Sequence, residues 1–268
     1  MNQDLSYKNK RIWELDFLRG FCILLMIIDH TFYDLAFIFQ GEWFGSLEGE
    51  GFLYLLTDFS KSVFFPSLGR KIIRPVAVFC FIFISGISCS FSHSNFKRGL
   101  RLAAVALVLT VATYGLDFLM QQENQLIIRF GILHLLAVSI LIYCLLRRFG
   151  KIAMALIGIL AIILGTYYLY NPLETNISYM AILVKSTTNF YSADYFPILP
   201  FIGYFLIGAA LGPLLYKHRT SLFPIDNLNR IRPVLFFGRN ALIVYLIHQP
   251  VIYAILYLIG WIFLTNAR

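Results

Sequence analysis

Apolar runs long enough to cross a lipid bilayer dominate this sequence. A transmembrane helix needs about 20 consecutive, mostly apolar residues, and seven such runs follow one another, at 17–38, 75–93, 100–120, 127–146, 152–171, 196–216 and 240–264. Hydrophobic residues make up 59% of the chain and charged residues only 13%, about half the charged fraction of a soluble domain, which excludes a soluble enzyme. We therefore predict an all-α, polytopic transmembrane bundle of about seven spans that forms one domain over residues 1–268.

The segment 52–69 is the ambiguous part of this pattern. It is aromatic and apolar, but it contains Asp58, Lys61 and Pro66. These residues favour an interfacial helix or a re-entrant element over a full span. An eighth span at this place remains an alternative.

The distribution of lysine and arginine predicts how the chain is oriented. With a cytoplasmic N-terminus, 15 of the 22 basic residues lie on the inner side: Lys8, Lys10, Arg11, Arg19, Lys97, Arg98, Arg101, Arg147, Arg148, Lys151, Lys217, Arg219, Arg230, Arg232 and Arg239. Basic residues are enriched in cytoplasmic segments, so we expect the N-terminus inside and the C-terminus outside. The cluster of Arg70, Lys71 and Arg74 is the exception, because this orientation places it outside. The net charge of +8 then reflects topology and lipid headgroups, and we expect no nucleic-acid partner.

Ionisable residues are concentrated in the first apolar run. At 100° per residue, Asp16, Arg19, His30 and Asp34 form one polar stripe along a helix, whereas Asp29 lies on another face. Asp34 follows His30 by four residues, the spacing that brings a carboxylate within reach of an imidazole. The stripe is either a buried ion-pair seam or a general base with its orienting group, His30 with Asp34 or, alternatively, Asp29.

Three histidines are expected at a similar depth in the membrane. Counting about 1.5 Å per helical residue, His30, His134 and His248 all lie near the midplane or in the outer half. Each alone can be an ordinary core histidine, but three at one level suggest a shared polar cavity. No histidine pair at i, i+4 and no H-E-x-x-H motif is present, so we expect no metal site.

Basic residues also flank two helix starts at the predicted inner face. They are Arg98 and Arg101 in one helix, and Arg239 with Asn240 at the start of the last. Helix N-termini with basic residues bind phosphate groups. The alternative is ordinary anchoring at the cytoplasmic surface.

Five blocks of sequence, in order, point to a known family. They are RIWELDFLRGFCILLMIIDH, FCFIFISGISCSFSHSNFKRG, RFGILHLLAVSIL, ADYFPILPFIGYFLIGAALG and GRNALIVYLIHQP. Together they resemble the bacterial DUF1624 proteins, which are related to the catalytic region of heparan-alpha-glucosaminide N-acetyltransferase. The resemblance implies a transmembrane acyltransferase of the bacterial inner membrane. It would move an acetyl or other acyl group from cytosolic acyl-CoA to an amine or hydroxyl of an extracytoplasmic sugar or glycan.

The resemblance also implies roles for individual residues. The lysosomal relative matches at Leu15, Asp16, Arg19 and Gly20, but its proposed catalytic histidine lies in the loop after the first conserved helix, where this chain has none. Either His30 takes over the role of base, or the chemistry and the acceptor differ. We expect Arg19, Arg98, Arg101, Arg239 and Asn240 to bind acetyl-CoA, and Arg129, His134, Asp194, Tyr195 and His248 to bind the acceptor.

Two other functional classes fit the same sequence. A small-molecule or proton-coupled transporter would also have a cavity lined by aspartate, histidine and arginine. A noncatalytic membrane partner is the third possibility. Membrane lipid is expected around the protein in every case, and a homodimer is left open.

Overall fold

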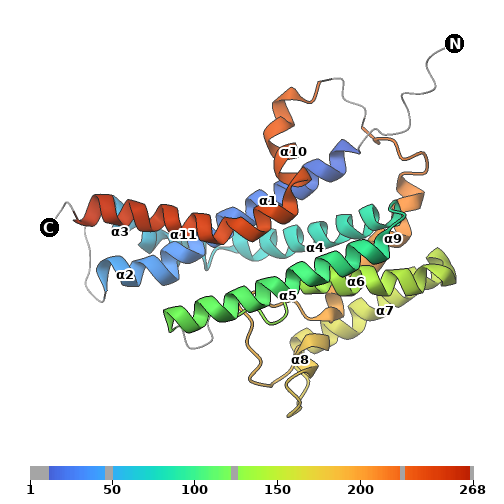
Figure 1. The fold of residues 1–268 in the computed structure, drawn as a ribbon, viewed down its shortest axis with the longest axis horizontal. Coiled ribbons are helices and arrows are strands. Elements are labelled where there is room, and N and C mark those ends of the chain that lie inside the picture. Colours follow the sequence, from blue (N-terminus) through green and yellow to red (C-terminus); the bar gives the residue numbers. More distant parts are fainter. Residues whose placement is uncertain (1–11, 46–50, 122–125, 224–226, 266–268) are drawn as a thin grey trace. The chain divides into compact units, whose positions relative to one another are not determined.

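The structure, a computed structural model, describes residues 12–45, 51–121, 126–223 and 227–265. Seven long helices lie within these ranges: α1 (Trp13–Asp34), α4 (Leu68–Ser90), α5 (Asn95–Met120), α6 (Ile132–Leu146), α7 (Gly150–Tyr170), α9 (Ile198–Leu215) and α11 (Ala241–Thr265) (Figure 1). Each corresponds to one predicted apolar run, so the prediction of an all-α bundle is confirmed. Four of the basic residues counted for orientation, Lys8, Lys10, Arg11 and Arg268, lie outside the described residues.

Shorter helical pieces connect or extend these helices. The π-helix η2 (Leu35–Phe39) and α2 (Gln40–Phe44) continue α1 without a break. The others are α3 (Phe52–Asp58), the π-helix η3 (Phe59–Phe64), the 3₁₀ turn η4 (Arg147–Phe149), α8 (Met180–Leu183), the 3₁₀ turn η5 (Asn229–Ile231) and α10 (Arg232–Arg239).

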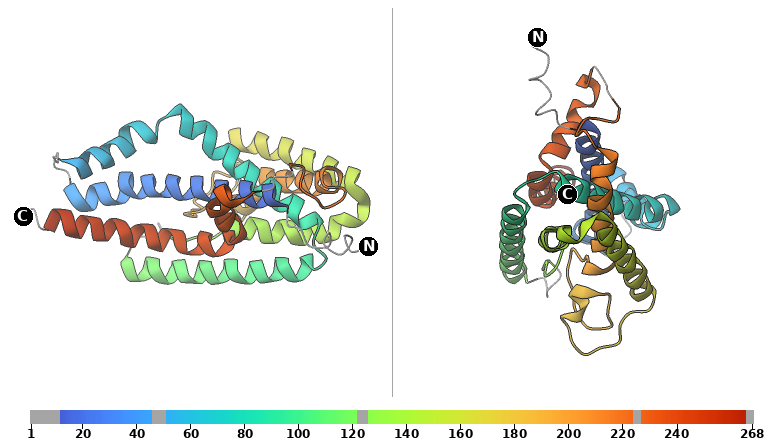
Figure 2. Two further views of the ribbon diagram at one scale, coloured as in Figure 1. Left: turned by 90° about the horizontal axis from the view of Figure 1, so that it is seen from above. Right: turned by 90° about the vertical axis from the view of Figure 1, so that its right-hand side faces the viewer.

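Six helical runs of the described chain are long and apolar enough to cross a membrane. They are Trp13–Phe44, Leu68–Ser90, Asn95–Met120, Ile132–Tyr170, Ile198–Leu215 and Ala241–Phe263. The fourth contains 39 residues and would rise about 58 Å if it were straight, nearly twice the ~30 Å hydrocarbon core. It contains two helices instead, because Gly150 has a φ of +86°, a conformation that favours glycine. The chain reverses there, so that α6 and α7 form a hairpin (Figures 1 and 2). These runs identify an integral membrane protein.

The segment predicted to be interfacial is helical but short. It contains the seven residues of α3 and the six of η3, which together rise about 20 Å. A full span needs about 30 Å, so the described helix does not form the alternative eighth span.

The described chain folds as two compact units. The first contains Ile82–Leu222, and the second contains Trp13–Phe81 together with the chain from Phe223 to the end of α11. Helix α4 begins in the second unit and ends in the first.

The first unit is held together by helices that approach closely at glycines. Helix α7 packs on α9, α5 packs on α6, and α6 also contacts α9. A Cβ atom added to Gly86 of α4 would overlap the carbonyl oxygen of Phe205, and one added to Gly208 of α9 would overlap that of Phe83. Small residues allow helix backbones to approach in this way in membranes.

The second unit is built around α1. Helix α1 packs against α10 and α11, and α1 and α11 lie side by side in Figures 1 and 2. Leu35 and Phe39 of η2 form a buried cluster with Ile252 and Leu256 of α11. This packing fixes the face of α1 that carries its polar residues against the face of α11 that carries His248.

Candidate active site

Two histidines meet inside the second unit, as their predicted depth suggests. The ring centroids of His30 on α1 and His248 on α11 are 4.9 Å apart, with an interplanar angle of 88°. Nδ1 of His30 lies 2.8 Å from the carbonyl oxygen of Met26, and Nδ1 of His248 lies 2.6 Å from that of Tyr245. A carbonyl oxygen can only accept a hydrogen bond, so each Nδ1 carries the hydrogen. In the neutral form each ring therefore has its lone pair on Nε2, the atom that can take up a proton.

A buried carboxylate lies beside the histidine pair. The side chain of Gln249 donates through Nε2 to both carboxylate oxygens of Asp34, at 2.8 and 2.9 Å, and Asp34 is fully buried. Pro250 follows directly and has no N–H, so the helix bond to the carbonyl of Leu246 is not made. His248 and Gln249 thus face α1 at a point where α11 lacks one backbone hydrogen bond.

Neither carboxylate orients His30 in the way that the spacing suggested. Among the described residues, Asp34 and Asp29 make no hydrogen bond to the imidazole, and the carbonyl of Met26 holds the ring instead. Asp34 is directed to Gln249, a partner on another helix that periodicity within α1 cannot reveal. A buried negative charge close to His30 still favours the imidazolium that forms when the ring accepts a proton.

Two buried polar atoms in this cluster have no hydrogen-bond partner among the described residues. They are Nε2 of His248 and Oε1 of Gln249, which are both acceptors in the arrangement above. Buried polar groups are almost always hydrogen-bonded, so exceptions need an explanation. Two neighbouring acceptors without donors fit a bound molecule that supplies N–H or O–H groups, as an amino sugar does.

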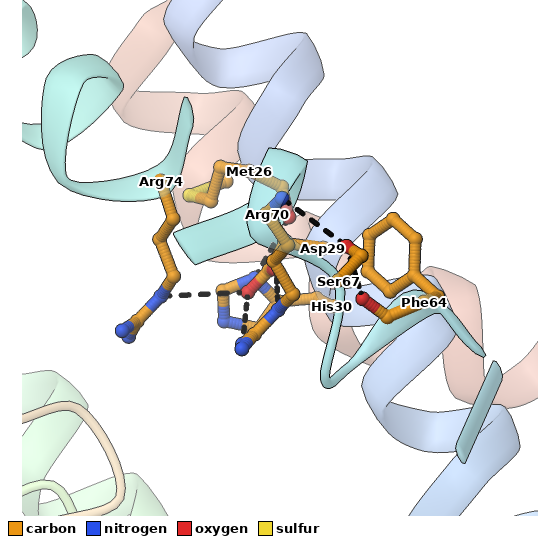
Figure 3. A network of polar contacts seen from close by, with 7 residues as sticks. All are labelled: Met26, Asp29, His30, Phe64, Ser67, Arg70 and Arg74. Atoms are coloured by element: carbon orange, nitrogen blue, oxygen red, sulfur yellow. Dashed lines mark hydrogen bonds and ion pairs between the residues drawn. The ribbon is translucent and has the colours of Figure 1, made fainter. Parts of the chain in front are cut away.

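Asp29 belongs to a separate cluster on α1, shown in Figure 3. Its carboxylate accepts two hydrogen bonds from Arg70, from Nε at 2.6 Å and from Nη2 at 3.2 Å. Arg74, one turn further along α4, lies 3.5 Å from the same carboxylate. The sequence marks Arg70 and Arg74 only as an exception to the expected distribution of basic residues. It cannot show their contact with Asp29, which lies 41 residues before Arg70 on another helix.

A third cluster lies toward the start of α1. Asp16 forms ion pairs with Arg19 at 3.3 Å and with Arg239 of α10 at 3.5 Å. Asn240 ends α10, and its side-chain amide donates to the carbonyl of Phe236. The carboxylate of Asp16 thus lies between two guanidinium groups, and Glu14 is a second buried carboxylate in the same first turn of α1.

Helices α1 and α10 approach closely at that third cluster. A Cβ atom added to Gly20 would overlap the carbonyl oxygen of Val234, and one added to Gly238 would overlap that of Asp16. The two glycines therefore set the distance between the helices that carry Arg19 and Arg239.

The remaining predicted residues belong to the first unit. Arg98 and Arg101 are exposed near the start of α5. His134 accepts a hydrogen bond from the N–H of Gly131 at Nδ1, so its Nε2 carries the hydrogen and faces the hydroxyl of Thr110 at 3.1 Å. Both ring nitrogens are occupied, and His134 caps the start of α6 by accepting the N–H of the N-cap residue Gly131, which is one half of a capping box.

Three more predicted acceptor residues also make internal hydrogen bonds. The carboxylate of Asp194 accepts the N–H of Ile132 at 2.8 Å, a favourable place for a negative charge at a helix N-terminus. Arg129 donates from Nε to the hydroxyl of Tyr114. Tyr195 donates to the carbonyl of Ala181, and burial raises the pKa of Tyr195 to about 12, so it stays a neutral donor. These contacts join the segments before α6 and α9 to each other and to α5 and α8.

No group of three or more histidine, cysteine or acidic side chains in the described ranges is arranged to hold a metal ion.

Comparison with known proteins identifies the family of the chain. The family model described as heparan-alpha-glucosaminide N-acetyltransferase, catalytic, matches residues 11–73 and 52–250, which include all three clusters around α1. No curated protein and no solved structure matches the chain. The chain belongs to the family of the heparan-alpha-glucosaminide N-acetyltransferase catalytic region, and its role is that of a transmembrane acetyltransferase-like protein.

Proposed function

We propose that this protein transfers an acetyl group from cytosolic acetyl-CoA to an amine or hydroxyl of an extracytoplasmic sugar or glycan. The proposal places it in the bacterial inner membrane with its N-terminus in the cytoplasm, as the basic residues favour. The observation that carries it is the pair of the half-buried His30 and the buried His248, whose Nε2 atoms are both available as acceptors. The family match supports the reaction class.

His30 serves as the general base in this mechanism. Its Nε2 takes the proton of the acceptor nitrogen or oxygen while that atom attacks the thioester carbon. The carbon–sulfur bond then breaks, and the CoA thiolate leaves and recovers a proton from the imidazolium. The buried charge of Asp34, held by Gln249, favours the imidazolium during this step because the low-dielectric interior strengthens the attraction.

His248 and Gln249 hold the acceptor in place. The lone pair on Nε2 of His248 and the oxygen Oε1 of Gln249 are buried without donors, so each accepts a hydrogen bond from the sugar. His248 is thus a hydrogen-bond acceptor toward the substrate and does not stabilise the oxyanion. Binding of this kind brings the nucleophile to Nε2 of His30.

Arg19 and Arg239 suit the phosphates of acetyl-CoA. They lie on either side of the carboxylate of Asp16, and guanidinium groups bind phosphates through charge-assisted hydrogen bonds. Eleven helical residues separate Arg19 from His30, a rise of about 16 Å, which an extended pantetheine arm can bridge. We assign Asn240, which follows Arg239 directly, to the same role, whereas Arg98 and Arg101 belong to the first unit and stay a prediction from their charge.

Acetyl transfer in detergent tests the proposal. Purified protein is incubated with radiolabelled acetyl-CoA and a panel of amino sugars, and labelled sugar is counted. We expect transfer by the wild type and a loss of at least 100-fold in His30→Ala, because a general base contributes about 10²- to 10⁴-fold. His93→Ala is the matched control, since His93 is exposed in the turn before α5, and should keep wild-type turnover.

Two results would count against the proposal at different levels. If calorimetry shows no binding of acetyl-CoA at millimolar concentration, the acetyltransferase function must be abandoned. If His30→Ala turns over as fast as the wild type, only the assignment of the base is wrong.

A further inference from the structure

The ion-pair cluster of Asp29, Arg70 and Arg74 contains more positive than negative charge. Asp29 contributes one negative charge, and Arg70 and Arg74 contribute two positive charges around it (Figure 3). The trio therefore carries a net charge of about +1. Both arginines lie in the first two turns of Leu68–Ser90, one of the runs able to cross a membrane, and ionisable groups that contact a transmembrane helix are candidates for a functional site.

Arg70 is fully engaged within this cluster. Its Nε and Nη2 atoms bind the two oxygens of Asp29, and its guanidinium carbon lies 3.9 Å from the ring centroid of Phe65. The side chain is only 18% exposed. Arg70 and Asp29 thus form a fixed platform, in which hydrogen bonding and the cation–π contact restrict the guanidinium.

Arg74 is engaged far less. It touches Asp29 only through Nε, at 3.5 Å, and its side chain is 59% exposed. The described residues provide no partner for its two terminal nitrogens. A guanidinium held at one edge, with its other donors open, can bind an oxyanion through two parallel hydrogen bonds.

The position of this cluster limits what the anion can be. Asp29 and His30 are consecutive on α1, and Figure 3 shows Arg70, Arg74 and the imidazole gathered around the same turn. A phosphate of acetyl-CoA cannot lie there during the reaction, because the pantetheine arm separates the phosphates from the thioester that reaches His30. An anionic group beside the base therefore comes from the other substrate.

We infer that Arg74, supported by the Asp29–Arg70 pair, binds an anionic group of the acceptor, and that the acceptor is an acidic sugar carrying a phosphate, sulfate or carboxylate. The inference rests on the proposed function for the identity of the bound molecule as an acceptor. The binding of the anion itself depends only on the geometry of the cluster. A lipid phosphate has the same chemistry, and the experiment separates the two sources.

Calorimetry without an acyl donor tests the subsite directly. Full-length protein in a neutral detergent is titrated with glucosamine 6-phosphate and, separately, with glucosamine. We expect the phosphate to lower the Kd at least ten-fold, because charge-assisted, bidentate hydrogen bonds to Arg are strong. Arg74→Gln should abolish this preference while leaving the affinity for glucosamine unchanged. Lys71→Gln removes the same charge from an exposed neighbour on α4 and should keep the preference.

Three results would overturn the inference. The first is equal affinity for the two sugars, or no binding of the phosphate, in the wild type. The second is an equal loss of preference in Arg74→Gln and Lys71→Gln, which would indicate a general effect of surface charge. The third is displacement of glucosamine 6-phosphate by phosphatidylglycerol added to the micelles, which would assign the site to a lipid headgroup. These titrations contain no acetyl-CoA. Failure of acetyl transfer in the separate assay would therefore disprove the proposed function without changing the measured affinities for the two sugars.

Discussion

The role of a polar side chain inside these helices depends on its hydrogen-bond partners. His30 and His134 are both histidines within apolar helices, yet only His30 has a ring nitrogen left for a substrate. Nδ1 of His30 binds the carbonyl of Met26, whereas His134 uses one nitrogen for Gly131 and the other for Thr110. The sequence places both at a similar depth, but it cannot show which ring is already hydrogen-bonded on both sides.

His134 should therefore behave as a structural residue. His134→Ala removes the ring from the start of α6, and we expect a loss of about 1–3 kcal/mol in the free energy of unfolding, the usual effect of leaving buried groups unpaired. His134→Gln should recover most of that loss, because glutamine at this position also accepts the N–H of the N-cap residue. Denaturation in mixed micelles measures both variants.

Steady-state kinetics distinguish a structural role of His134 from a role in binding the acceptor sugar. Turnover and KM per folded molecule should match the wild type in His134→Gln. A KM for the sugar raised ten-fold in that variant, with stability recovered, would show that His134 contacts the acceptor after all.

Individual residues also show how far the sequence could lead toward the site. Counting helical rise predicts a similar depth for His30, His134 and His248 and suggests one shared cavity, whereas the structure brings only His30 and His248 into ring contact. The partners of Asp34 and Asp29 could not be predicted, since Gln249 and Arg70 come from other helices. Hydropathy and periodicity describe one helix at a time and do not specify which faces meet.

At the scale of elements, the helices that cross the membrane were predictable and those at their ends were not. Apolar runs of about 20 residues specify helices because every backbone group must be hydrogen-bonded in lipid. Helix α10 has only eight residues and lies in a stretch with several charges, so no apolar run marks it. The extension of α1 to Phe44 was missed for a similar reason, because Gln40 and Glu42 interrupt the hydrophobic pattern.

The crossing of α1 and α10 depends on two glycines, which makes it easy to test. Gly238→Ala places a methyl group on the carbonyl oxygen of Asp16, so the helices must separate. We expect a loss of about 2–3 kcal/mol in the free energy of unfolding, as for other overpacked sites, and weaker binding of acetyl-CoA because Arg239 moves away from Arg19.

The matched control for this substitution is Gly115→Ala in α5. A Cβ atom at Gly115 meets nothing within 4 Å, and alanine favours a helix over glycine by about 1 kcal/mol. This variant should be as stable as the wild type or slightly more so. Equal stability of the two variants in denaturation experiments would refute the close crossing at Gly238.

For the whole molecule, the central claim is that an acetyl group enters from one side of the membrane and leaves on a sugar at the other. The helices able to span a membrane, the family match and the arginine pair beside Asp16 all support this interpretation. A transporter with the same polar residues would move the sugar itself, unchanged.

Transfer across sealed proteoliposomes separates these possibilities most directly. The amino sugar is trapped inside, radiolabelled acetyl-CoA is added outside, and the vesicles are washed and their contents analysed. We expect acetylated, labelled sugar inside vesicles that contain wild-type protein and none inside vesicles that contain His30→Ala. Labelled sugar that forms only when both substrates are on the same side, or unmodified sugar that leaves the vesicles, would contradict this expectation.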